Sequence, residues 1–224
     1  MNHTRRSAWY LATVLALLAN GVCWGAPGEE LSKTNFVYRG FHIDFREIQN
    51  TNTLAATRAA LREQIDGVFT VGVTANILGF FQKVPFKAIR ETAGQAASPA
   101  LYNETNQTIE TTAAILTAGH QPVLLHELLK AYHQQRYEGG FTNAEIQTFY
   151  ERAKTIKAYA TNSVILADAK EYFAGCATTY LFGVSDQEPF QREKLLKHQP
   201  VFYARLELLF GSNAGQYLGT LEHR

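Results

Sequence analysis

The sequence predicts an α+β fold, in which a small mixed β region in the N-terminal half precedes a mostly helical C-terminal half. Residues 36–45 alternate between apolar and polar side chains, as a strand with one buried face does. Weaker strand signals follow at 86–89 and 108–112. After residue 121, helix caps and helical spacing recur to the end of the chain. At 224 residues and 46% hydrophobic content, we expect one domain over 36–224.

The other N-terminal elements follow from local signals. Gly40 is expected to kink the first strand. Residues 51–68 predict a helix, because apolar side chains recur there at helical spacing. A short second helix is expected over 74–83, and Pro85 then prevents its continuation.

Five helices are expected after residue 121. Pro122 suits the first turn of the first one, and Gly139 ends it. Asn143 and Asp168 are residues that cap helix N-termini, and they begin the next two. The expected ranges are 122–138, 143–159, 168–182, 189–197 and 200–210.

Residues 1–26 have the layout of a secretory signal peptide. Two arginines precede an apolar run over 9–18, and small residues allow cleavage between 21 and 26. The run is too short for an anchor across a bilayer, and no later stretch is apolar enough to span one. We therefore expect a secreted or periplasmic protein without a membrane span after cleavage, beginning with a flexible lead-in over 27–35.

Charge and cysteine content exclude other classes. Loss of Arg5 and Arg6 with the leader changes the formal charge from +1 to −1, so nothing suggests a nucleic-acid partner. Cys23 lies at the end of the leader and Cys176 is deep in the chain, so an internal disulfide is not expected. The sequence carries no signal for the oligomeric state.

The segment His126–His133 reads HELLKAYH and is close to the zinc-peptidase motif HExxH. In that motif two histidines one helical turn apart bind one metal, and the glutamate acts on the bound water. Lys130 stands here in place of the second histidine. His133 is roughly 10 Å from His126 along the helix axis, which is too far for both to bind one ion. We expect His133 to be structural or at the rim of a cleft.

Three segments together carry a family resemblance. They are His126–His133, the run Glu171-Tyr172-Phe173-Ala174, and the run Tyr180-Leu181-Phe182-Gly183. The pattern resembles the lethal-factor-like metallopeptidases of the gluzincin branch of the zincins. It is closer still to a group of bacterial secreted proteins with HELLHAYH followed by E-(Y/F)-F-A. The likeness covers about residues 61–210 and implies a zincin-like fold, a zinc cofactor, and a peptide or protein substrate.

The resemblance also implies roles for individual residues. His126 corresponds to the first zinc ligand, Glu127 to the general base, and Glu171 to the third ligand. Lys130 takes the position of the second ligand, and Val164 the position of a tyrosine that helps to stabilise the oxyanion. A protonated amine has no lone pair to give and repels a divalent cation. The sequence therefore predicts that zinc binding and catalysis are impaired.

Three functions remain open at this point. The first is a metallopeptidase-like protein, or pseudoenzyme, whose hydrolase chemistry is impaired. The second is an active zinc peptidase with a non-standard ligand set, which would bind near-stoichiometric zinc. The third is a non-enzymatic protein that retains the substrate cleft of the peptidases and binds a peptide or a cell-wall fragment there. Chelators would not affect this binding.

Overall fold

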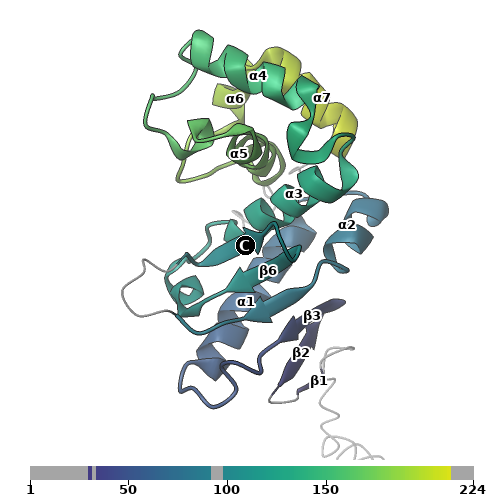
Figure 1. Cartoon of the computed structure of the whole chain (residues 1–224), viewed down its shortest axis with the longest axis vertical. Coiled ribbons are helices and arrows are strands. Elements are labelled where there is room, and N and C mark those ends of the chain that lie inside the picture. The colour runs from purple at the N-terminus through teal and green to yellow at the C-terminus, as the bar shows by residue number, and fades with distance from the viewer. Residues whose placement is uncertain (1–29, 32–33, 92–97, 213–224) are drawn as a thin grey trace, which may run out of the picture.

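A computed structural model describes residues 30–31, 34–91 and 98–212 (Figure 1). The expected leader and its cleavage site lie outside these residues. The predicted α+β class is confirmed, with a six-stranded sheet in the N-terminal half and a helical remainder. The strands are β1 Glu30–Leu31, β2 Asn35–Tyr38, β3 Phe41–Asp44, β4 Phe86–Ala88, β5 Ala100–Asn103 and β6 Thr108–Thr111. The α-helices are α1 Leu54–Thr70, α2 Ala75–Phe81, α3 Val123–Arg136, α4 Ala144–Thr155, α5 Ala169–Phe182, α6 Arg192–His198 and α7 Pro200–Phe210, and short 3-10 helices are η1 Ala113–Thr117, η2 Gly140–Thr142 and η3 Val164–Leu166.

The strand order in the sheet is β1-β2-β3-β4-β6-β5. Neighbours β3, β4 and β6 run parallel, whereas β1, β2 and β3 pair antiparallel and β5 pairs antiparallel with β6. Strand β5 is therefore an edge strand. The sequence assigned residues 27–35 to a flexible lead-in, but 30–31 form β1 and 35 belongs to β2. These strands pair through backbone groups, which leave no periodic pattern of apolar side chains.

The single strand expected over 36–45 was wrong, because this segment is a hairpin. Tyr38 pairs with Phe41, so Arg39 and Gly40 form a two-residue turn. Both have positive φ, 48° and 81°, as tight hairpins require. The apolar alternation stays in phase across such a turn, which is why it resembled one kinked strand. The strands expected at 86–89 and 108–112 are confirmed as β4 and β6, whereas β5 was missed.

Helices α4 and α5 start where the capping residues predicted, although α4 ends at Thr155 instead of near 159 and α6 begins at Arg192 instead of 189. Asn143 Oδ1 accepts the Ile146 N–H at 2.8 Å, and Asp168 Oδ1 accepts the N–H groups of Lys170 and Glu171 at 2.8 and 2.9 Å. Helix α5 ends before Gly183, whose φ is 95°. These caps fix the register of α4 and α5, and with it the direction of the side chains in their first turns.

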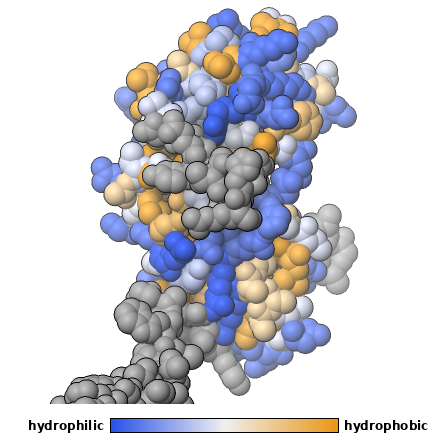
Figure 2. Space-filling model, turned by 180° about the vertical axis from the view of Figure 1, so that it is seen from behind, coloured by the Kyte–Doolittle hydropathy of each residue, from blue (hydrophilic) through white to orange (hydrophobic). Residues whose placement is uncertain are grey.

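Helix α3 lies between the sheet and the C-terminal helices (Figure 1). It contacts β5 and α1 on one side and α5 on the other. Its leucines at 124, 125, 128 and 129 are buried in one hydrophobic cluster that continues from the hairpin to α7. Figure 2 shows that hydrophobic residues form small groups between hydrophilic ones on the opposite face of the molecule. Within the described ranges, the helices are too short or too polar to traverse a lipid bilayer.

Candidate functional site

A groove of about 490 Å³ lies between β5 and α5, with α3 at its floor. The edge strand contributes Ala100 and Leu101, and the opposite wall contains Glu171, Thr178 and residues 185–187. His126, Glu127 and Lys130 line it from α3. The groove is therefore built where the sheet half meets the helical half.

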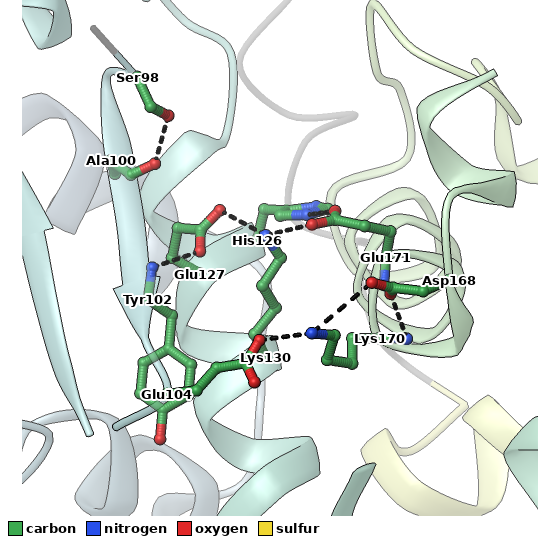
Figure 3. A network of polar contacts seen from close by, with 10 residues as sticks. All are labelled: Ser98, Ala100, Tyr102, Glu104, His126, Glu127, Lys130, Asp168, Lys170 and Glu171. Atoms are coloured by element: carbon green, nitrogen blue, oxygen red, sulfur yellow. Dashed lines mark hydrogen bonds and ion pairs between the residues drawn. The ribbon is translucent and has the colours of Figure 1, made fainter. Parts of the chain in front are cut away.

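Four side chains meet at the floor of this groove (Figure 3). His126 Nε2 and Glu171 Oε2 lie 2.9 Å apart. Lys130 Nζ lies 2.6 Å from Glu171 Oε1 and 3.1 Å from Glu127 Oε1. The structure thus brings together His126, Glu127, Lys130 and Glu171, although 45 positions separate the two ends of the set. We call these four residues the floor cluster.

The local sequence explains why these side chains converge. His126 and Lys130 are one turn apart on α3, on the face away from buried Leu128 and Leu129. Gln64 of α1 holds the start of this helix, because its side chain donates to the carbonyls of Gly119 and Gln121 and accepts the Leu124 N–H. Packing on one face of α3 therefore aims the polar face into the groove.

Glu171 reaches the cluster from the first turn of α5. The Asp168 cap orients that turn, and the positive end of the helix dipole favours a carboxylate there. Burial alone would raise the pKa of Glu171, but His126 and Lys130 outweigh it and hold this pKa at about 2. Glu171 is therefore ionised at neutral pH.

The amine of Lys130 is charged in this setting. Its side chain is only 11% exposed. Burial alone would lower its pKa, but Glu127 and Glu171 outweigh this effect and raise the pKa above the ordinary value. An ammonium at this position donates hydrogen bonds and has no lone pair for a metal.

The side chains of the floor cluster do not provide the ligand set that zinc requires. Structural and catalytic zinc sites use at least three protein ligands from His, Cys, Asp and Glu. In the part of the chain that the structure describes, no three such residues are arranged to hold a metal ion. His126 and Glu171 contact each other, and the group in the position of a further ligand is the Lys130 ammonium, which contacts Glu171. The residues as arranged do not fit zinc.

Glu127 is also occupied by contacts within the protein. Its Oε1 accepts from Lys130, and its Oε2 accepts the backbone N–H of Tyr102 in β5 at 2.6 Å. Its side chain is 8% exposed. A general base needs an accessible lone pair directed at the proton it removes. Here the carboxylate instead joins α3 to the edge strand.

His133 and Val164 lie in different places. His133 is fully buried and packs against the rings of Tyr137, Phe141 and Phe173. We expected His133 to be structural or at the rim of a cleft. The buried position is a structural one, and His133 does not line the groove. Val164 does line the groove and is 51% exposed, but it offers no hydroxyl to a ligand.

Residues of β5 were the ones that sequence reasoning missed. Tyr102 supplies the N–H bound by Glu127, and Ser98 Oγ donates to the Ala100 carbonyl at 2.7 Å on the same strand edge. The contact of Glu127 with Tyr102 leaves no sequence signal, because it depends on a backbone group whose position is set by sheet pairing. Comparison of this chain with family models, with curated proteins and with solved structures found no match.

Proposed function

We propose that this chain is an exported, zincin-like protein related to zinc metallopeptidases, with impaired zinc-dependent catalysis. The observation that carries the proposal is the Lys130 ammonium, bound to Glu127 and Glu171 at the groove floor. It stands at the position of the second ligand in the HExxH pattern. A metal site that lacks one of its ligands loses much of its affinity for the metal. In addition, Glu127 Oε2 already accepts the Tyr102 N–H, so this oxygen is not free to act as a general base.

The test is zinc content together with peptide hydrolysis. Purified protein is exposed to excess zinc, desalted and assayed for bound metal, and a quenched-fluorescent mixture of random peptides is offered as substrate with and without a chelator. We expect far less than one zinc per chain and no chelator-sensitive hydrolysis. Near-stoichiometric zinc, with hydrolysis that disappears in Glu127→Gln, would instead support an active peptidase with a non-standard ligand set.

A second candidate function is binding of an extended peptide in the groove without cleavage. It is supported by the position of β5, an edge strand that borders the groove. The Tyr102 N–H points away from β6, so by strand alternation the backbone of Ala100 also faces the groove. The Ala100 carbonyl already accepts from Ser98, which leaves its N–H as the group for an added strand.

This candidate is tested by filling the groove. Thr117 is an exposed groove residue whose hydroxyl bonds the Ala114 carbonyl, and Thr155 is an exposed residue of α4 with the same type of bond to Glu151. Thr117→Trp should abolish retention of random hexapeptides in affinity-selection mass spectrometry, whereas Thr155→Trp should not. Equal retention by both variants would contradict binding in this groove.

A further inference from the structure

We infer that the Lys130 ammonium is a permanent internal cation that holds the Glu127 and Glu171 carboxylates in place of a metal ion, and that histidine at this position would complete a zinc site. The inference rests on the proposed function for the lack of zinc in the unaltered protein. It goes further by giving Lys130 a positive role in the fold, and by placing a latent metal site in the floor cluster.

One ammonium connects three elements of the fold. Lys130 Nζ contacts one oxygen of each carboxylate, at 2.6 Å in Glu171 and 3.1 Å in Glu127. The other oxygen of Glu171 contacts His126, and the other oxygen of Glu127 accepts the Tyr102 N–H. The chain of contacts runs from β5 through α3 to α5, and its central member is the cation.

Burial makes this cation necessary. The exposed fraction of the Glu127 side chain is 8% and that of Glu171 is 22%. Two carboxylates and one ammonium give this part of the cluster a formal charge of −1, and without Lys130 the charge would be −2. Removing one partner from a buried ion pair leaves an uncompensated charge that strongly destabilises the fold. A metal ion and a lysine are two ways to prevent this.

Two residues that could bind zinc, His126 and Glu171, already lie nearly as close together as ligands on one zinc ion. Zinc binds nitrogen and oxygen at about 2.0–2.2 Å with tetrahedral geometry, so two of its ligands lie roughly 3.3–3.5 Å apart. Glu171 already contacts the side chains of both residue 126 and residue 130, at 2.9 and 2.6 Å. A histidine at position 130 would lie on the same face of α3 as His126. The small separations mean that only local adjustment is required.

The experiment compares four proteins: the unaltered chain, Lys130→His, Lys130→His combined with Glu171→Gln, and Lys130→Met. Zinc per chain is measured after desalting, and the Tm is measured with zinc or with a chelator. Lys130→His should bind close to one zinc, and zinc at about a thousand times Kd should raise its Tm by roughly 10 °C. The unaltered protein should show neither effect, and the double variant should lose most of the zinc.

Lys130→Met tests the internal cation separately. Its Tm should lie below that of the unaltered protein in zinc and in chelator alike, because neither condition supplies a cation to the cluster. A Tm equal to that of the unaltered protein would overturn the structural role of Lys130. Zinc uptake by Lys130→His no greater than that of the unaltered protein would overturn the latent metal site.

Folding of Lys130→His is checked by dilution from denaturant. Folding in zinc but not in chelator would support the inference, and failure in both would overturn it. Chelator-sensitive hydrolysis by unaltered protein that carries far less than one zinc per chain would contradict the proposed function alone, because the gain of zinc by the variant could still be observed. Stoichiometric zinc in the unaltered protein, lost in His126→Ala, would overturn both.

Discussion

Lys130 and His133 are neighbours on α3 that experience opposite environments. Lys130 lies between two carboxylates, which favour its charged form. His133 lies among aromatic rings, and burial lowers its pKa to about 4. At neutral pH the helix therefore presents a fixed cation to the groove and an uncharged imidazole to the core.

The pKa of His133 predicts a pH dependence of stability. The unfolded chain binds a proton at this residue near its ordinary pKa of 6.5, whereas the folded chain binds it only near 4. The free energy of unfolding should therefore fall by about 3 kcal/mol as the pH drops from 6.5 towards 4. His133→Leu should remove this loss, as measured by urea unfolding at several pH values. The control is His42→Leu at an exposed position, and an equal effect of both substitutions would contradict the assignment.

At the scale of elements, α4 and α5 could be predicted because their start signals are local. Asn143 and Asp168 bond N–H groups two or three residues away, so the sequence itself contains both partners. The amphipathic pattern of α3 likewise placed His126 and Lys130 on one polar face. The pairing of that face with Glu171 came from the family resemblance and not from periodicity.

Strand β5 could not be predicted in this way. Its residues, Ala100–Asn103, include Ala and Asn, which are poor strand formers, and its pairing with β6 is antiparallel across a tight turn. The sheet order also places β6 between β4 and β5, which only long-range packing determines. The contact between Glu127 and Tyr102 follows from that order, so the sequence could suggest the general base but not its partner.

The link between Glu127 and β5 predicts one altered amide. The Tyr102 N–H faces away from β6 and is bound by Glu127, whereas by strand alternation the N–H groups of Leu101 and Asn103 face β6. In Glu127→Ala, hydrogen exchange of the Tyr102 amide should speed up by roughly tenfold or more, since a charged hydrogen bond contributes about 1.5–3 kcal/mol. Exchange at Leu101 and Asn103 should change little.

The matched control for this exchange experiment is Glu104→Ala. Glu104 is an exposed acid next to the same strand, and its carboxylate pairs with Lys170 instead of a β5 amide. This substitution should leave the Tyr102 amide protected. Faster exchange of Tyr102 in both variants would mean that general fraying of the edge strand, and not loss of the Glu127 bond, is responsible.

At the scale of the whole molecule, the interface of α3 with α5 joins the sheet half to the helical half. Both His133, against Phe173 of α5, and Lys130, against Glu171 of α5, lie in this interface. Protonation of either His133 or Glu171 therefore weakens the same junction. The two groups titrate in different ranges, so their effects on the stability of the molecule can be separated by pH.

Acid should destabilise the protein in two successive windows. The ordinary pKa of Glu171 is 4.5 and the folded value is about 2, so its contribution is present above pH 4.5 and is lost as the pH falls towards 2. His133 accounts for the window from 6.5 towards 4. In urea unfolding followed by circular dichroism, His133→Leu should therefore keep its stability down to about pH 4.5 and lose it below.

Glu171→Gln should be less stable at neutral pH, because the Lys130 ammonium loses a charged partner, but it should lack the lower window. A loss below pH 4.5 that is as steep in Glu171→Gln as in the unaltered protein would show that other carboxylates carry the acid sensitivity, and that the junction of the two halves does not depend on the Lys130–Glu171 pair.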